Sequence, residues 1–465
     1  MRKFSILAMV AAFILGTVAL ASAVEMKARG SFRVHANWTD NYNLEKTKQD
    51  NESEDDFNVY QRARVYFDFI ANENVKAVLG FEIGDLTWGT DGQAQLGTDE
   101  KGIIEVKHAY LDFKLPETEI DVKAGLQGIT LPNNLGSAIL SDDMAALVLN
   151  IPVNDMFSVT AGWARLYNND ATQKTTTTTT VDNNGTDAIS PFEVTTTTTT
   201  TPYNYHDEDD MAFLVLPIKM DGYTITPFGA YAWIGKDSSL SADPKKDSHA
   251  YWLGVSGKVT AIDPIVVMFD LNYGKLNADN DTYDASGWFM DLAVDYKMDM
   301  MTPELFFLYS SGEDSNIKDG HEVMPIISPD ITATSFGFDG SALAHGGNII
   351  HDANNNNYLG LWALGLKLKD ISFMENLSHT LTFMYGKGTS DKDYVNNGGD
   401  DSTLTTKDSF TEFDFDTKYK MYENLAAIVE LGYAKINYDE DLGTRGNNYK
   451  DQAAWKLAVG VKYNF

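Results

Sequence analysis

The sequence predicts an all-β protein: a transmembrane antiparallel up-and-down β-barrel of about 18 strands, or about 16, with short periplasmic turns and long extracellular loops. Three features lead to this fold class. Segments of about 10 to 14 residues alternate between apolar and polar side chains, as tilted membrane strands do. The connections between these segments alternate between short and long. After the amino-terminal segment, no apolar run is long enough for a spanning helix.

The amino terminus predicts a cleavable secretory signal at residues 1–23. Arg2 and Lys3 precede an apolar run from Phe4 to Leu20, and Ala21-Ser22-Ala23 is a small-x-small cleavage site. We therefore expect export, with the barrel in residues 24–465 and in the cell outer membrane. The net charge of −31 argues against nucleic acid as a partner and favours nearby cations. The chain has no cysteine, which excludes disulfides and thiol chemistry.

The strands follow from a side-chain period of two residues. In the first one, Phe32, Val34 and Ala36 alternate with Arg33 and His35. The 23 Tyr, 24 Phe and 8 Trp suit aromatic girdles at the two membrane interfaces. The apolar rows of the expected strands begin at Phe32, Ala63, Ala77, Ala109, Val122, Ala145, Phe157, Met211, Tyr223, Tyr251, Val267, Trp288, Leu305, Trp362, Leu381, Phe413, Val429 and Trp455.

The last strand, 452–465, carries a further signal. Trp455, Leu457, Val459, Val461, Tyr463 and Phe465 share one parity, and Lys456 and Lys462 lie on the other. A terminal aromatic residue with apolar residues at every second position upstream is similar to the assembly signal of bacterial outer-membrane barrels. The resemblance implies that Tyr463 and Phe465 are read by the barrel assembly machinery.

The connection lengths favour a barrel over a soluble β-sandwich, which has no reason to sort them by parity. A closed sheet also has no free edges, which lipid could not satisfy. The short connections are Ala71–Asn74, Pro116–Glu119, Pro152–Asp155, Asp221–Gly222, Ala261–Pro264, Asp299–Met301, Ile371–Asn376 and Met421–Asn424. The long ones are Thr39–Asp56, Asp85–Gly102, Gly128–Asp143, Asn168–Glu208, Lys236–Ser248, Leu276–Ala285, Gly312–Asn357, Thr389–Lys407 and Asp439–Lys450.

Two of the long loops have unusual compositions. The loop at about 168–208 contains Thr175–Thr180 and Thr195–Thr201, a low-complexity pattern typical of a mobile outer loop. The alternative for this loop is surface recognition or a glycan-bearing role. The loop Gly128–Asp143 is instead rich in small and apolar residues, and we expect it to fold inward as a constriction loop. In it, Leu131, Leu135, Ile139 and Leu140 would pack on the wall.

The charged residues of the inward parity define the expected pore. Asp142 and Asp143 of the constriction loop would face a basic wall, and the field between them would sort solutes by size and charge. The predicted constriction consists of Asp142, Asp143, Arg33, Arg62 and Arg64, with Lys76 and Lys123 nearby. The rest of the pore wall would include Glu82, His108, Asp112, Lys456 and Lys462. The alternative is that these are ordinary charges of a wet face.

Several stretches resemble one family, the outer-membrane homotrimeric porins of sulfate-reducing bacteria. They are FEIGDLTWGTDG (Phe81–Gly92), LGTD (Leu96–Asp99), EVKHAYLDF (Glu105–Phe113), VKAGLQGITLPN (Val122–Asn133) and GSAILSDDMA (Gly136–Ala145). The likeness is dense from about Tyr60 to Leu149, includes the terminal strand, and thins across the Thr-rich loop and much of the second half. It implies a homotrimer of water-filled channels, each narrowed by its third loop. By analogy with porins in general, the loop Asp85–Gly102 would latch onto a neighbouring subunit.

These features predict a porin for the passive diffusion of small hydrophilic solutes and ions, with no cofactor. One alternative is a channel specific for a sugar or oligosaccharide, with Tyr60, Tyr66, Tyr110 and Trp252 as stacking surfaces. A second is a structural or adhesive envelope protein, whose acidic loops would bind Ca²⁺ or Mg²⁺ loosely, next to lipopolysaccharide. We expect no enzyme and no dedicated metal site, because the eight histidines form no metal-ligand pair at helical spacing.

Overall fold

The computed structural model describes residues 24–42, 55–97, 104–168, 173–182, 193–202, 208–236, 240, 246–343, 348–354, 357–443, 445 and 451–465. The predicted signal segment 1–23 lies outside these residues. The described chain forms a closed antiparallel barrel, and the prediction of 18 strands is confirmed. Each strand pairs with the next one along the chain, and the last strand pairs with the first from Ser31↔Asn464 to Asp40↔Trp455.

Seventeen barrel strands are continuous, and one is interrupted. The continuous strands are β1 (Glu25–Asp40), β2 (Asp55–Asn72), β3 (Val75–Thr87), β4 (Ile104–Lys114), β5 (Asp121–Thr130), β7 (Ser141–Pro152), β8 (Ser158–Asn168), β13 (Tyr223–Ile234), β14 (Ser248–Ile262), β15 (Ile265–Asn277), β16 (Ala285–Tyr296), β17 (Thr302–Ser310), β19 (Leu361–Met374), β20 (Leu377–Gly388), β21 (Ser409–Tyr422), β22 (Leu425–Asn437) and β23 (Gln452–Asn464). The interrupted strand consists of β11 (Glu208–Val215) and β12 (Ile218–Met220), which both pair with β13. Pro217 lies at the break, because proline has no amide hydrogen to donate to the ladder.

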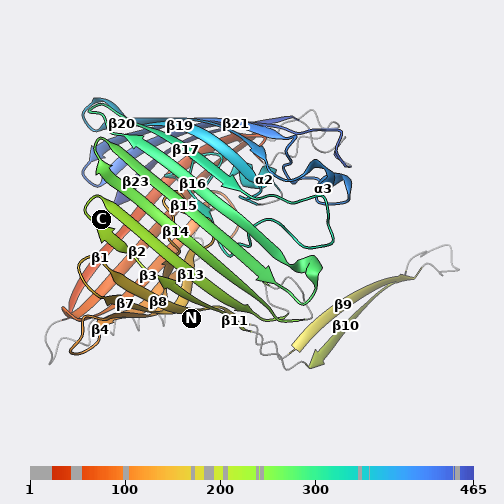
Figure 1. Cartoon of the computed structure of the whole chain (residues 1–465), viewed down its shortest axis with the longest axis horizontal. Helices are drawn as coiled ribbons and strands as arrows, with labels where there is room; N and C mark the ends of the chain where they lie inside the picture. Colours follow the sequence, from red (N-terminus) through yellow and green to blue (C-terminus); the bar gives the residue numbers. More distant parts are fainter. Residues whose placement is uncertain are drawn as a thin grey trace.

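The predicted alternation of connections is confirmed. The turns at one end are as short as Glu73-Asn74, whereas the longest connection at the other end, 311–360, spans fifty residues. Figure 1 shows the turns gathered at the left end of the barrel and the loops at the right. Within the described residues, no helix is long and apolar enough to span a membrane.

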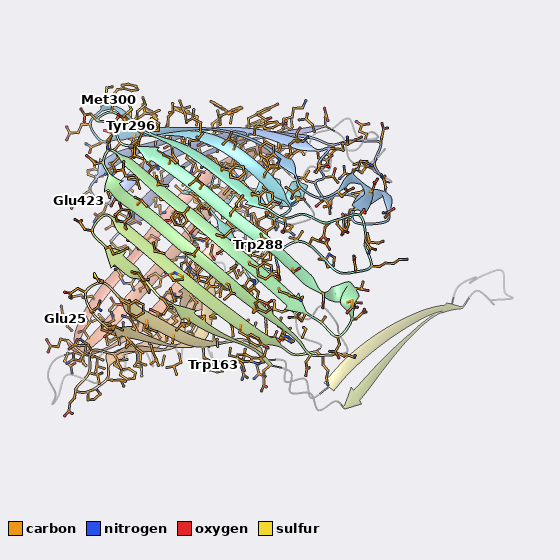
Figure 2. The ribbon with its side chains drawn as sticks, viewed as in Figure 1. Glu25, Trp163, Trp288, Tyr296, Met300 and Glu423 are labelled. Carbon is orange, nitrogen blue, oxygen red and sulfur yellow. The ribbon has the colours of Figure 1, made fainter. Side chains whose placement is uncertain are left out.

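The two faces of the wall have opposite chemistry. On β1, Phe32 and Trp38 are 48% and 38% exposed on the outside, whereas Arg33, His35 and Asn37 are buried on the inside. Trp163 and Trp288 lie towards the loop end, and Tyr296 lies at the turn end (Figure 2). This distribution matches an apolar belt between two aromatic girdles.

Two long loops enter the barrel and form its core. We call residues 131–140 the first inner loop and the described residues of 311–360, which are 311–343, 348–354 and 357–360, the second inner loop. Their short strands β6 (Gly136–Ser137) and β18 (Asp330–Ile331) pair with each other. The buried apolar side chains of the two loops include Leu131, Leu135, Ile139 and Leu140 from the first and Ile331, Phe336 and Phe338 from the second.

The inner loops differ from the sequence-based expectation in two ways. Asp142 and Asp143 belong to β7, because Ile129↔Asp142 and Gly128↔Asp143 are paired across the ladder. The excursion is therefore shorter than Gly128–Asp143. The second inner loop was expected outside the barrel as a polar loop, yet its scattered apolar residues bury themselves inside. It also carries the short helix α2 (Ile349–Ala353).

The outer loops carry three further elements. They are the 3₁₀ turn η1 (Asp281–Tyr283), the helix α3 (Lys392–Asn396) and a hairpin of β9 (Gln173–Asp182) and β10 (Glu193–Pro202). In the hairpin the two threonine runs pair with each other, for example Thr177↔Thr198. The pairing suits the β-branched threonine, which favours extended backbone. The hairpin projects away from the barrel (Figure 1).

Candidate functional site: the lumen wall and the inner loops

Three arginines from two neighbouring strands form a cluster on the inner wall. Arg33 Nη2 lies 2.8 Å from Asp85 Oδ1, and Arg62 Nη1 lies 3.3 Å from Asp85 Oδ2. Arg64 forms an ion pair with Glu82. These carboxylate partners, Asp85 and Glu82, differ from the expected Asp142 and Asp143.

Asp142 and Asp143 have other partners. Asp143 forms ion pairs with Lys107 and His108, the latter at 3.0 Å between Oδ1 and Nε2. Asp142 Oδ2 accepts a hydrogen bond from Ser328 Oγ of the second inner loop at 2.8 Å. Lys107 was not among the expected pore residues because a bulge shifts the parity of β4: Gly80 pairs with His108, but Phe81 pairs with Val106.

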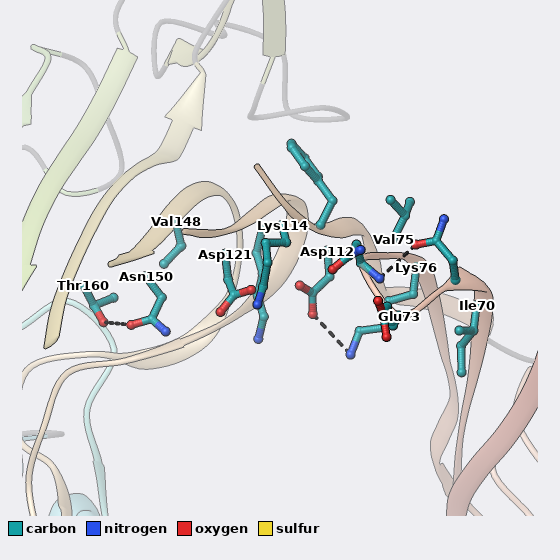
Figure 3. Close-up of a pocket in the computed structure, with 14 residues that line it drawn as sticks. Ile70, Glu73, Val75, Lys76, Asp112, Lys114, Asp121, Val148, Asn150 and Thr160 are labelled. Carbon is teal, nitrogen blue, oxygen red and sulfur yellow. Dashed lines mark hydrogen bonds and ion pairs between the residues drawn. The ribbon is translucent and has the colours of Figure 1, made fainter. Parts of the chain in front are cut away.

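Lys76 and Lys123 lie at the turn end of the lumen. Lys76 Nζ is 3.2 Å from Asp112 Oδ2, and both residues line a cavity of about 610 Å³ together with Lys123, Asn150 and Thr160 (Figure 3). Lys76 is next to the turn after β2, whereas Glu82 is six residues further along β3, with its partner Arg64 opposite it on β2. That separation is about 20 Å along a strand. The two lysines thus belong to a vestibule and not to the arginine cluster.

The two lysines of the last strand have different environments. Lys456 is fully buried, and its Nζ donates to Ser335 O at 2.8 Å and contacts Glu430 Oε2 at 3.3 Å. It fastens the second inner loop and does not face water, which differs from the expected pore-wall role. Lys462 lines a cavity of about 450 Å³ near the turn end, with Lys418 and Lys420. In the part of the chain that the structure describes, these three lysines have no ion-pair partner.

Three of the four candidate stacking residues lie on the inner wall, and the fourth is buried. Tyr60, Tyr66 and Tyr110 lie on the inner wall of β2 and β4, where Tyr66 contacts His108 with ring centroids 5.1 Å apart. Trp252 is fully buried beneath the second inner loop, and its Nε1 donates to Pro325 O at 2.7 Å. It cannot stack on a solute in this conformation.

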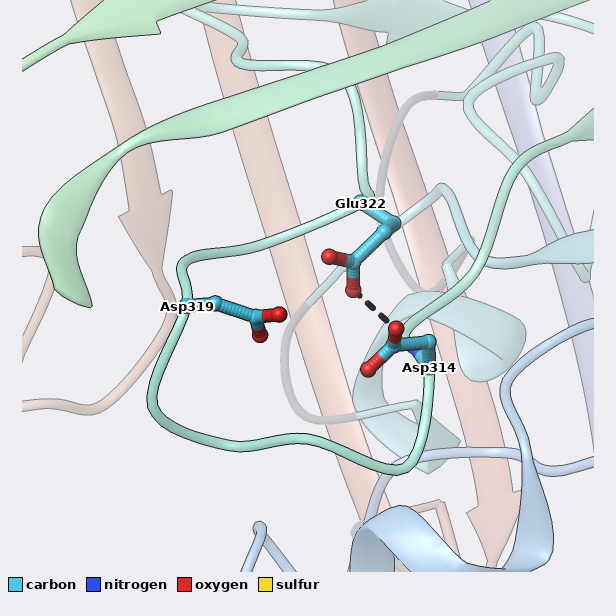
Figure 4. A group of neighbouring side chains, drawn as sticks. All are labelled: Asp314, Asp319 and Glu322. Carbon is cyan, nitrogen blue, oxygen red and sulfur yellow. Dashed lines mark hydrogen bonds between the residues drawn. The ribbon is translucent and has the colours of Figure 1, made fainter. Parts of the chain in front are cut away.

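Titratable groups of the second inner loop lie at its outer part. A hydrogen bond to Glu313 Oε1, 3.0 Å from Nδ1, raises the pKa of His321. Next to this pair, the carboxylate oxygens of Asp314, Asp319 and Glu322 come within 4.8 Å of one another (Figure 4). Asp314 N donates to Glu322 Oε2 at 2.9 Å. Two of the three side chains are exposed, and such acidic groups are common on surfaces without an ion.

No family model and no curated protein matches the sequence. Solved structures do match over nearly the whole chain. OpdQ of Pseudomonas aeruginosa is 12% identical, with 96% of this chain and 99% of that chain covered, at a TM-score of 0.53. OccAB1 of Acinetobacter baumannii is 12% identical over the same shares, at 0.51. The outer membrane protein OprD from P. aeruginosa is 12% identical over 96% of both chains, at 0.50.

This chain has the fold of OprD. The OprD-like barrel covers the described residues from the first strand to the last, so the shared architecture is that of outer-membrane proteins. At this identity the likeness concerns the fold, and the lumen residues must be judged on their own contacts.

Proposed function

We propose that the protein is an outer-membrane porin, through which small hydrophilic solutes and ions diffuse passively. The observation that carries this proposal is a closed barrel with an apolar exterior and a charged interior, narrowed by two inner loops. A lumen of this kind selects by size at the constriction and by charge along the wall. The solved structures that share the fold support the same placement in the outer membrane.

Several cations gather on one part of the lumen wall. The three arginines contact Asp85 and Glu82, and the neighbouring cavity is lined by Lys418, Lys420 and Lys462 together with the carboxylates of Asp370, Asp416, Glu423 and Glu430. The positive charge of Lys462 is repelled by four neighbouring cations, which are Arg33, Arg62, Arg64 and Lys418. The acidic total of the chain does not decide selectivity, because the local balance at the narrow part of the lumen sets the barrier for each ion.

The second candidate is a channel specific for a hydroxylated solute such as a sugar or an oligosaccharide. The cavity of Lys418, Lys420 and Lys462 is also lined by the hydroxyls of Ser378 and Thr380. Hydroxyl and ammonium groups on one wall can hydrogen-bond a polyol. Saturable block of the current by an oligosaccharide would favour this candidate, whereas purely size-limited flux favours a general porin.

We further propose a homotrimer of the type found in sulfate-reducing bacteria, exported through the signal segment 1–23. The proposal rests on the resemblance of residues 60–149 to that porin family. The tip of the loop Asp85–Gly102, which would latch onto the neighbour, lies partly outside the described residues. Lipopolysaccharide, with loosely held Ca²⁺ or Mg²⁺, would contact the acidic outer loops. An adhesive role remains the third candidate, with the projecting threonine hairpin as its surface.

Conductance of the purified protein in planar lipid bilayers tests the proposed function. We expect stepwise insertions of equal size, grouped in threes for a trimer, and ohmic currents that scale with salt. Flux of neutral sugars of increasing size into loaded vesicles would then give the size limit. Folded protein that inserts into bilayers without any current would contradict the porin proposal and leave the adhesive role.

A further inference from the structure

The second inner loop rests on a row of carboxylates that project from the wall. Ser335 N donates to Asp414 Oδ2 at 3.3 Å, and Gly337 N donates to Glu412 Oε1 at 2.8 Å. Further along, Ala342 N donates to Glu430 Oε1 at 2.7 Å. Glu412, Asp414 and Glu430 are all at most 1% exposed. The loop is therefore held by its backbone amides, and its attachment to the wall depends on whether these carboxylates are protonated or ionised.

Two of these carboxylates touch each other. Glu412 and Asp414 are two residues apart on β21, on the same face, and their side chains are in hydrogen-bonding contact. Among the described residues, neither Glu412 Oε2 nor Asp414 Oδ1 has a donor in hydrogen-bonding geometry, and the hydroxyl of Thr334 is the neutral neighbour of Glu412. Two carboxylates in contact and away from water cannot both be ionised. One proton between them would supply the missing donor.

The charges around this pair do not remove the need for a proton. β23 contributes Lys456, which is already bound to Glu430 of β22. On β21 itself, Asp416 follows Asp414 on the same face. From β20, Thr382 and Met384 face the pair, and neither titrates. The second inner loop contributes Thr334, Ser335 and Gly337, which carry no charge. Negative groups outnumber the one lysine, so ionisation of both members would be strongly opposed.

The same arrangement recurs on the opposite part of the wall. Asp270 and Asp291 are directly paired across β15 and β16, and they are 2% and 3% exposed. Asp270 Oδ2 accepts from Asn134 N of the first inner loop at 2.7 Å, while both oxygens of Asp291 lack a donor among the described residues. From β17, the uncharged Leu308 lies opposite Asp291, and from β14, Ser256 Oγ accepts from Asn134 Nδ2. A negative charge on Asp291 would therefore be repelled by Asp270, its partner across the ladder.

We propose that each pair holds one shared proton, and that these two protons latch the inner loops to the barrel wall. When alkali removes a proton to water, two negative charges remain in contact without a counter-ion. Their repulsion separates the carboxylates and breaks the amide bonds to Ser335, Gly337 and Asn134. The loops then leave the wall and the lumen widens. The inner loops are thus a pH-sensitive gate, a property beyond passive sieving.

The first test does not depend on channel activity. Infrared spectra of the full chain in lipid vesicles should show, at neutral pH, the carbonyl-stretch absorption of protonated buried carboxyl groups. The double variant Glu412→Gln/Asp414→Asn keeps the shape of the pair and one acceptor oxygen on each side chain but cannot bind the proton, and it should lose part of this absorption. The variant Asp270→Asn/Asp291→Asn should lose another part. The variant Glu119→Gln, in an exposed turn, is the control and should lose none.

The second test is electrical and rests on the proposed channel function. In planar bilayers between about pH 6 and 9.5, the ratio of released to latched channels should rise about tenfold per pH unit for each proton lost. Both double variants should flatten this dependence, and the control should keep it. Absence of the infrared absorption in the wild type, or an unchanged pH dependence in both double variants, would overturn the proposal. A wild type with the absorption but no current would contradict the porin function and leave the shared protons standing.

Discussion

Replacing Lys418 and Lys462 by glutamine should shift the selectivity of the channel towards cations. Both side chains line one cavity near the turn end, and neither has an ion-pair partner among the described residues. A unit charge about 4 Å from an ion in water contributes about 1 kcal/mol, attractive for an anion and repulsive for a cation. Salt weakens this over about 10 Å at 0.1 M. We therefore expect the double variant to change the anion/cation permeability ratio by about 1 kcal/mol, or about fivefold.

The reversal potential across a bilayer with a KCl gradient measures this ratio directly. The variant Lys392→Gln is the matched control, since it removes one lysine from helix α3, where Asp393 already pairs with it. The control should keep the wild-type reversal potential. A double variant with an unchanged reversal potential would refute the contribution of these two lysines to selectivity.

Three further predictions concern the loops and the terminal strand. Asn134→Ala removes the amide that donates to both oxygens of Asp270, so the first inner loop should lose about 1–3 kcal/mol of stability and its amides should exchange hydrogen faster. The pKa of His321 is raised by Glu313, so this pair should protect the second inner loop fully below about pH 6.5 and lose that protection as the pH rises past the raised pKa. Proteolysis of that loop should therefore accelerate across this pH range in the wild type, and it should accelerate less in His321→Gln. Phe465→Ala should fold into vesicles more slowly by gel mobility, because the ring stacks on its neighbours at the end of the ladder.

The wall of the barrel was predictable from the sequence because its physics is local. A period of two residues identifies the strand faces, and the lengths of the connections identify the two rims. Arg33, Arg62 and Arg64 were placed on the inner face by parity alone, and in the structure they contact Asp85 and Glu82. Lys107 was missed since one bulged residue moves a side chain to the other parity, and alternation cannot reveal a bulge.

The contents of the barrel were not predictable in the same way. The second inner loop has neither a strand period nor a helix period, so its polar composition indicated an outer loop. Phe336 and Phe338 are buried in a segment that is held by Lys456 of β23 and by Glu412 of β21, and both of these residues lie far away in the sequence. Asp142 and Asp143 were expected to face the arginines from a constriction loop, but they belong to β7, and their partners depend on the register between β4, β5 and β7.

The filled lumen explains why this wall carries so many buried ionisable groups. The inner face of a strand in a water-filled barrel carries polar residues, and water supplies the hydrogen bonds that these side chains need. Where an inner loop covers such residues, water is lost, and each charge must find a partner within the protein or become neutral. Lys456 and Glu430 take the first solution with an ion pair, and Glu412 and Asp414 take the second with a shared proton. The inner loops thus convert part of the wet wall into a protein interior, and the attachment of the loops becomes coupled to the charge of the wall.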